Sequence, residues 1–185
     1  KWLDILNAFW DCAVTKRNYY ATGSMNAGEY WIPPKKQAGF MGDRNQEFCT
    51  VYNMVRLADY LYKFTGDKKY CDYIELNLYN GFLAQQNKES GMPTYFLPMQ
   101  AGSYKTWGTK TRDFWCCHGS MVQSQTIYPS LCYYAGENGE VIINQYIPST
   151  LKDEEKGVSL KQTCGMKYYY DAALFDETSD GLMSR

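Results

Sequence analysis

Two adjacent cysteines, Cys116 and Cys117, lie in the stretch FWCCHGS beside His118, the only histidine of the chain. Thiolates are nucleophiles and soft metal ligands, whereas buried free cysteines behave as small apolar side chains. The pair could therefore fill a core, form a vicinal disulfide, bind a metal or supply a nucleophile. Which of these applies depends on what the fold brings close to the pair.

A second pair, Glu47 and Cys49, lies two residues apart in QEFCTVYN, where a loop is expected to enter a helix. Side chains at this spacing diverge on a regular helix but face the same way in extended backbone. Adjacent cysteines can likewise converge on one ion only through irregular backbone at a loop-to-helix junction. Together the two pairs would make a tetrahedral site of one carboxylate and three thiolates, which favours zinc over magnesium or calcium. From spacing alone, buried free cysteines are the commoner alternative.

The cysteine count argues against a disulfide framework. Seven cysteines in 185 residues cannot all pair within the chain, and the length is not that of a small disulfide scaffold. We expect reduced thiols, some of them bound to metal. The cysteines outside the two pairs are expected to be structural, with Cys71 in a helix core; they are Cys12, Cys71, Cys132 and Cys164.

Apolar residues at three-and-four spacing predict the helices that would position these pairs. One helix is predicted over residues 2–17, and a second starts near Phe48 and ends at Gly66. A third follows at once, capped by Asp67, so the last two should form an antiparallel αα-hairpin. The apolar face of the first helix is expected to comprise Trp2, Ile5, Leu6, Phe9 and Ala13.

Two long loops rich in glycine, asparagine and proline interrupt this pattern, over residues 19–46 and 87–113. Loops of this length in compact domains are often functional. The second loop leads to the cysteine pair, after which a helix is predicted to begin near Ser120 and to end or kink around Pro129.

The residue composition of the sequence changes near Asn138. VIINQYIP is β-branched and aromatic, and GVSLKQT alternates apolar with polar residues, so both are predicted to be strands. We therefore expect a helical domain over residues 1–137 and the start of a β domain over residues 138–185.

Composition narrows the classes of function. The formal net charge is -1 without a basic stripe, so a nucleic-acid partner is not expected. No apolar run reaches the roughly 20 residues that a bilayer span requires, and no signal-peptide pattern opens the chain, which is expected to be a mature or internal fragment. Aromatic residues make up 17% of the chain, a content that suits core packing and carbohydrate stacking equally.

Several longer motifs occur in a recognisable order. They are YYATGSMNAGEY, QEFCTVYNMVRLADYLYKFTGDKKYCDYIELNLYNGFLAQQ, GMPTYFLPMQAGSYKTWGT, FWCCHGS and VIINQYIPSTL. This order resembles glycoside hydrolase family 127, the β-L-arabinofuranosidases formerly known as a domain of unknown function. The resemblance covers most of the chain up to about Gln162, whereas residues 163–185 resemble no identified family.

The resemblance implies a mainly α fold and a glycosidase. The catalytic domain of the family is an (α/α)6 toroid followed by β-sandwich domains, and the helices of this chain would form the second half of the toroid. The implied partner is a carbohydrate that carries terminal L-arabinofuranose or a related plant-wall sugar, and the protein could also form a homo-oligomer. The cellular compartment stays open.

The resemblance also implies a role for each residue that matches a motif of the family. By resemblance, Cys116 is the nucleophile that attacks the anomeric carbon, and Glu29, which ends the glycine-rich loop, is the general acid/base. Zn²⁺ would be held by Glu47, Cys49 and Cys117, with the Cys116 sulfur also in its sphere. In a retaining geometry the Glu29 carboxyl and the Cys116 sulfur should lie about 5 Å apart.

Tyr95 and His118 are the remaining candidates. Tyr95 matches a tyrosine of the family that contacts the sugar, although an ordinary loop tyrosine would give the same pattern. His118 could serve as a base, but the sugar-binding histidines of the family lie upstream, so no direct role is expected for it. The alternative function is a non-catalytic carbohydrate-binding or structural homologue in which zinc staples two loops; the presence of Glu29 favours the enzyme.

Overall fold

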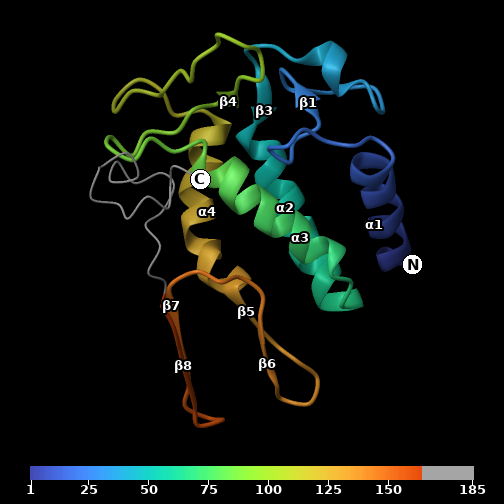
Figure 1. Cartoon of the computed structure of the whole chain (residues 1–185), viewed down its shortest axis with the longest axis vertical. Helices are drawn as coiled ribbons and strands as arrows, with labels where there is room; N and C mark the ends of the chain where they lie inside the picture. Colours follow the sequence, from blue (N-terminus) through green and yellow to red (C-terminus); the bar gives the residue numbers. More distant parts are fainter. Residues whose placement is uncertain (164–185) are drawn as a thin grey trace, which may run out of the picture. The chain divides into compact units, whose positions relative to one another are not determined.

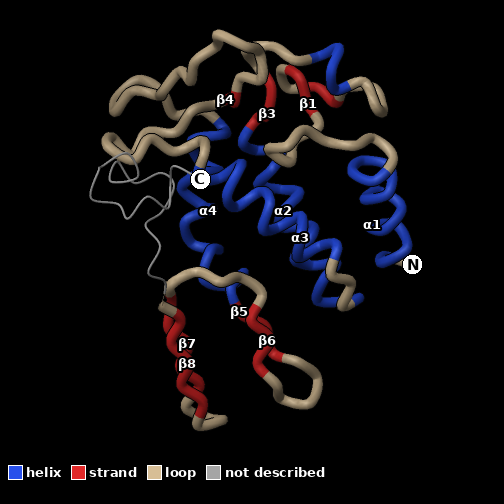
Figure 2. Tube along the Cα trace, in the orientation of Figure 1, coloured by secondary structure: helices blue, strands red, loops and turns tan. Residues whose placement is uncertain are grey.

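The computed structural model describes residues 1–163, and the chain divides into two compact units. The first unit, Lys1–Thr126, holds most of the helices, and the second begins at Ile127 and contains β-hairpins (Figures 1 and 2). Helix α4, Cys116–Cys132, carries the chain from the first unit into the second. The fold is mainly α, as expected, and Cys164 lies outside the described residues.

The first helix forms where the sequence predicts it, but its buried face differs. Helix α1, Trp2–Trp10, continues as a π-helix over Asp11–Thr15. The expected face is partly wrong: Trp2 is 77% exposed, whereas the buried side chains are Trp10, Ala13 and Val14. The reason is tertiary packing, because α1 turns the side that carries Trp10 toward Tyr70 and Tyr73.

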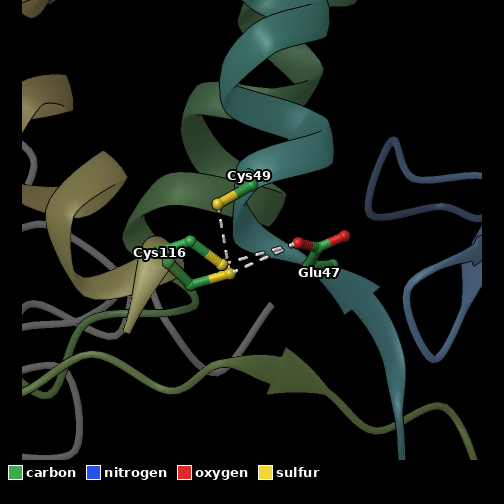
Figure 3. Close-up of side chains that lie close together, drawn as sticks. Glu47, Cys49 and Cys116 are labelled. Atoms are coloured by element: carbon green, nitrogen blue, oxygen red, sulfur yellow. Dashed lines mark hydrogen bonds between the residues drawn. The ribbon is translucent and has the colours of Figure 1, made fainter. Parts of the chain in front are cut away.

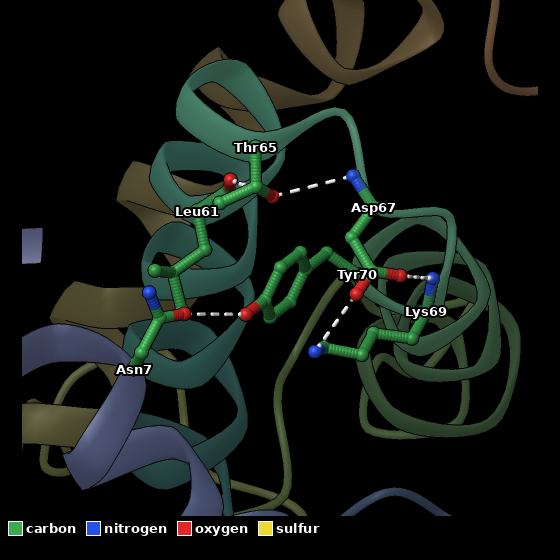
Figure 4. Close-up of polar contacts among 6 residues, drawn as sticks. All are labelled: Asn7, Leu61, Thr65, Asp67, Lys69 and Tyr70. Carbon is green, nitrogen blue, oxygen red and sulfur yellow. Dashed lines mark hydrogen bonds and ion pairs between the residues drawn. The ribbon is translucent and has the colours of Figure 1, made fainter. Parts of the chain in front are cut away.

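The predicted αα-hairpin is confirmed. Helix α2, Phe48–Thr65, ends at Gly66, which has a left-handed φ of 67° and donates its N–H to the Tyr62 carbonyl. Helix α3, Lys69–Asn77, follows and continues as a π-helix over Leu78–Leu83. Asp67 accepts the Lys69 N–H at 3.1 Å and so provides the expected cap (Figure 4).

Packing on this hairpin holds α1 in place. The Trp10 ring meets the edges of Tyr70 and Tyr73, with centroids about 5 Å apart, and the Tyr70 hydroxyl donates to Asn7 at 2.9 Å (Figure 4). The α2–α3 interior is fully buried and apolar, and includes Phe48, Val51, Val55, Ala58, Leu61, Ile74 and Phe82. This rigid core supports the loops that carry the site.

Both long loops contribute strands to one small antiparallel sheet that the sequence patterns did not reveal. Its order is β2-β1-β3-β4, and it lies beside the start of α2 (Figure 1). Each strand has only two or three residues, too few for an alternating pattern to stand out. The loops also contain a short 3-10 helix, Gln37–Phe40. The strands are β1 (Asn26–Ala27), β2 (Tyr30–Trp31), β3 (Asn45–Glu47) and β4 (Phe96–Leu97).

The second unit holds two antiparallel hairpins. Strand β5, Tyr133–Ala135, pairs with β6, Val141–Ile143, and β7, Ser149–Asp153, pairs with β8, Val158–Gln162. The strand predicted in GVSLKQT is therefore confirmed, and the strand predicted in VIINQYIP is confirmed over Val141–Ile143. The Gln162 side chain joins the two hairpins, because its amide donates to the Tyr133 hydroxyl and the Gln145 carbonyl.

Within the described residues, no helix combines the length and the apolar character that a membrane crossing requires.

Candidate active site

The junction between β3 and α2 positions the first pair of candidate ligands. Glu47 is the last residue of β3 and Cys49 is the second residue of α2. Extended backbone before Glu47 and helical backbone after it let the two side chains turn toward the same space. The expected loop-to-helix arrangement of this pair is confirmed.

The second pair lies at the first turn of α4. The Trp115 carbonyl accepts the N–H groups of His118 at 3.0 Å and Gly119 at 3.2 Å, so Cys116 and Cys117 are the first two helical residues. The predicted start near Ser120 was four residues too late. The helix does not end at Pro129, because α4 continues through this residue to Cys132; a kink there stays a prediction.

These two junctions meet. One ligand atom from each of Glu47, Cys49, Cys116 and Cys117 can be chosen so that all four lie within 4.8 Å of one another (Figure 3). The Cys117 sulfur lies 3.4 Å from the Cys49 sulfur, and both adjacent cysteines lie 3.9 Å from Oε1 of Glu47. We call these four residues the Glu/Cys cluster.

The geometry and chemistry of the cluster fit zinc. Zinc–sulfur bonds of about 2.3 Å in a tetrahedron give edges of about 3.8 Å. The 3.4 Å separation of the Cys117 and Cys49 sulfurs is close to this sulfur–sulfur edge length. Three sulfurs and one carboxylate are also a donor set that selects zinc rather than a hard cation.

The electrostatics of the cluster reflect how closely its acidic groups are packed. The hydrogen bond from Cys117 lowers the pKa of Cys49 to about 6 and raises the pKa of Cys117 itself. Burial raises the pKa of Glu47 and of Cys116. Four acidic groups in so small a volume repel one another once ionised, and a cation relieves this repulsion.

Ser120 supports the cluster from the next turn of α4 and was missed by the sequence analysis. Its hydroxyl lies 3.1 Å from the Cys49 sulfur. A hydrogen bond to a ligand sulfur fixes its orientation and stabilises its charge. No motif indicates this role, because Ser120 is an ordinary serine next to the glycine of FWCCHGS.

Replacing this hydroxyl should weaken zinc binding. We expect Ser120→Ala to lower zinc affinity by about 10-fold, since loss of an outer-shell hydrogen bond costs roughly 10–100-fold in affinity. Competition with a chromophoric chelator measures the change. Ser130→Ala, which removes another α4 hydroxyl bonded only to the helix carbonyl of Ile127, is the matched control. Equal affinities for the two variants would contradict a role for Ser120.

A tight hairpin presents Glu29. Gly28 and Glu29 form the two-residue turn between β1 and β2, and Gly28 adopts a left-handed φ of 57° that favours glycine. The Gly28 N–H also donates to the Arg44 carbonyl at 2.6 Å. The turn is therefore anchored, and the exposed Glu29 carboxylate projects from its tip.

The Tyr95 hydroxyl connects Glu29 to Cys116. It donates to Oε1 of Glu29 at 2.5 Å and lies 2.9 Å from the Cys116 sulfur. The oxygen–sulfur separation therefore cannot exceed the roughly 5–5.5 Å found between the two catalytic carboxyl groups of retaining glycosidases. Burial and both contacts raise the pKa of Tyr95, so the phenol stays neutral.

A cavity of about 1060 Å³ opens beside these groups. Its volume is at the upper end of the roughly 300–1,000 Å³ of small-molecule sites. Its wall includes Glu29 and Tyr95 together with the aromatic rings of Trp107 and Trp115 and the Arg44 side chain. Aromatic faces suit sugar stacking, and a guanidinium can bond sugar hydroxyls. The sequence analysis did not single out either tryptophan or Arg44.

Of the other candidates, His118 also lines the cavity, although only 4% of the residue is exposed, and burial lowers its pKa. Among residues 1–163, the cysteines away from the cluster are free: Cys12 is exposed, Cys71 is partly buried with its pKa raised to about 11 by burial, and Cys132 is buried.

Comparison with known proteins identifies the family. The family model described as "Beta-L-arabinofuranosidase, GH127 catalytic domain" matches residues 1–130. No curated protein matches the chain. The matched segment is more than half of the 185 residues and contains every residue of the Glu/Cys cluster as well as Glu29 and Tyr95. The chain therefore belongs to the GH127 β-L-arabinofuranosidase family of glycoside hydrolases.

Proposed function

We propose that the protein is a retaining glycosidase with Cys116 as nucleophile and Glu29 as general acid/base. The observation that carries the proposal is the contact of both groups with one hydroxyl, that of Tyr95. A carboxyl and a nucleophile at this separation leave room for one anomeric centre between them but not for an additional water, which is the requirement for retention.

The Glu/Cys cluster is proposed to hold Zn²⁺ through Glu47, Cys49, Cys116 and Cys117. When bound, zinc would keep the coordinating sulfurs deprotonated. A free thiol with a pKa of about 8.5 is only a few per cent ionised at neutral pH, so such activation would raise the thiolate population roughly 30-fold. The start of α4 adds to this, because the positive end of the helix dipole favours negative charge on Cys116.

In the first step the Cys116 sulfur attacks the anomeric carbon and forms a carbon–sulfur bond. The glycosidic carbon–oxygen bond breaks, and Glu29 gives its proton to the departing oxygen. In the second step Glu29 takes a proton from water, and the water oxygen displaces the sulfur from the opposite face. The sugar leaves with its original configuration, and Cys116 and Glu29 return to their starting states.

The proposed substrate is a glycan with terminal L-arabinofuranose or a related plant-wall sugar. The family of the chain and the aromatic lining of the cavity support this choice. Tyr95 is proposed to contact the sugar, because its hydroxyl lies where the reacting centre would enter. The anomeric configuration of the first-formed product tests the mechanism: proton NMR during hydrolysis of an aryl β-L-arabinofuranoside should show retention, and inversion would contradict it.

The alternative of a zinc staple in a non-catalytic homologue predicts a different pattern. A structural zinc site requires the Glu/Cys cluster but does not require a carboxylate held near one of its sulfurs through Tyr95.

For the whole fold, we propose that residues 1–137 belong to an (α/α)6 toroid and that residues 138–185 begin a β-sandwich domain. The protein could form a homo-oligomer.

Removing a cluster residue that is not the nucleophile should abolish zinc binding. We expect Cys49→Ala to reduce bound zinc from about one equivalent to nearly none, because an apolar methyl replaces one of four ligands. Zinc content by elemental analysis of the purified protein measures this. Cys12→Ala changes an exposed thiol outside the cluster and should keep the full equivalent. Undiminished zinc in Cys49→Ala would contradict the assigned ligands.

A further inference from the structure

His118 is the only histidine of the chain, and its ring is almost completely buried, with 4% of the residue exposed. Its Nδ1 accepts the backbone N–H of Trp115 at 3.3 Å. In the neutral ring the proton therefore resides on Nε2, which has no hydrogen-bond partner among the described residues. The ring lies in the wall of the cavity, and neither of its nitrogens has a hydrogen bond to Glu29 or to the Glu/Cys cluster.

The Nδ1 contact occurs at a defined position of α4. The Trp115 carbonyl accepts the first helical hydrogen bonds, so Trp115 is the N-cap and His118 is the third helical residue. A side chain at that position that accepts the N-cap N–H completes one half of a capping box, a role usually filled by Glu or Gln. The two residues enclosed by this contact are Cys116 and Cys117.

The opposite side of the ring packs on the loop that closes the cavity. A Cβ on Gly108 would lie 2.4 Å from Nε2, so the ring occupies the space that any other side chain at this position would need. This loop is fixed in turn, because the Gly108 N–H donates to the Pro93 carbonyl at 2.9 Å and Trp107 pairs with Thr94. The ring of His118 therefore joins the start of α4 to the segment that leads into Tyr95.

Aromatic contacts complete the arrangement. The Trp115 ring meets the His118 ring edge-on at 5.4 Å and the Tyr95 ring edge-on at 6.0 Å. One continuous set of contacts thus runs from His118 through Trp115 to Tyr95, whose hydroxyl touches Cys116.

We propose that His118 is a positioning residue: by capping α4 and packing on Gly108, it fixes the Cys116 sulfur relative to Tyr95 and the rest of the Glu/Cys cluster. The inference rests on the proposed function, since it concerns the placement of the proposed nucleophile. His118 itself touches neither the sugar nor the metal in this account.

Two substitutions of His118 distinguish its role as a helix cap from its role in filling space. Leucine fills similar space without an acceptor, whereas glutamine supplies an amide oxygen that can cap from the third helical position. We expect His118→Leu to lower zinc affinity and kcat by about 10–100-fold, the range for residues that orient ligands, and KM to change by less than about twofold. His118→Gln should recover both quantities to within about threefold of the unsubstituted protein.

Gly108→Ala displaces the ring without removing it and should reproduce the losses of His118→Leu. Tyr70→Phe, which removes a buried hydrogen bond to Asn7 far from the cavity wall, is the control and should change neither zinc affinity nor kcat. Full-length protein is used, and zinc affinity is measured by chelator competition.

Hydrogen exchange at the Gly119 amide, which bonds to Trp115, reports on the cap without reference to zinc or turnover. Exchange should accelerate in His118→Leu and stay slow in His118→Gln. Equal exchange, zinc affinity and kcat in His118→Leu and the unsubstituted protein would overturn the positioning role, as would a glutamine variant no better than leucine. If the unsubstituted protein binds no zinc, the proposed function fails, and the exchange comparison still decides the role of His118.

Discussion

Cys116→Ser is expected to lower kcat on an aryl β-L-arabinofuranoside by about 10⁴-fold or more, the scale seen when the nucleophile of a covalent mechanism is removed. A serine hydroxyl is far less acidic than a thiol and remains protonated, so it attacks the anomeric carbon poorly. KM should change little, since the cavity wall formed by Tyr95, Trp107 and Trp115 is unaltered.

The control for this substitution is Cys12→Ser, which makes the same atomic change at an exposed cysteine outside the cluster. It should retain full activity. Thermal unfolding and circular dichroism of both variants establish that the fold is intact. Turnover by folded Cys116→Ser within about tenfold of the unsubstituted protein would remove Cys116 from the nucleophile's role.

Glu29→Gln should lower kcat by about 10²–10⁴-fold, the usual contribution of a general acid/base. The loss should depend on the leaving group. A 4-nitrophenolate needs no proton to depart, so with this leaving group only the second step should become slower. With an alkyl or sugar leaving group, both steps should become slower. Steady-state rates over a series of leaving groups measure this dependence.

Glu75→Gln is the matched control, because Glu75 is an exposed carboxylate on α3 away from the cavity. It should leave every rate unchanged. A uniform loss across all leaving groups in Glu29→Gln would indicate that Glu29 binds substrate rather than transferring protons.

The members of the Glu/Cys cluster could be named from the sequence, but not from spacing alone. The spacing of Glu47 and Cys49 and the adjacency of Cys116 and Cys117 allow a zinc site, yet buried free cysteines were the commoner interpretation until the resemblance to the family was considered. Spacing could not show that the two junctions meet, because their contact depends on how α2 and α4 pack. The structure brings the four side chains together.

The positions of Glu29 and Tyr95 could not be predicted from local sequence patterns. Glu29 and Tyr95 lie 66 residues apart and were singled out by resemblance to the family. They meet through a sheet whose strands have two or three residues, too short for alternation to reveal. The bridging position of the Tyr95 hydroxyl is a tertiary property that no local pattern encodes.

Two errors in the helices have identifiable causes. The buried face of α1 is determined by the tertiary contacts of Trp10 with Tyr70 and Tyr73, which hydrophobic spacing within the helix cannot anticipate. The early start of α4 depends on a cap supplied by His118 to Trp115, which an ordinary capping pattern of Ser, Thr, Glu or Gln would not indicate.

The most direct test of the mechanism is to trap the sugar on the enzyme. Glu29→Gln is mixed with 4-nitrophenyl β-L-arabinofuranoside, quenched with acid and digested, and the peptides are analysed by mass spectrometry. The account predicts one pentose residue attached to the sulfur of Cys116, because formation of the thioglycoside outpaces its hydrolysis in this variant. A pentose on any other side chain, or nitrophenolate release without any labelled peptide, would contradict it.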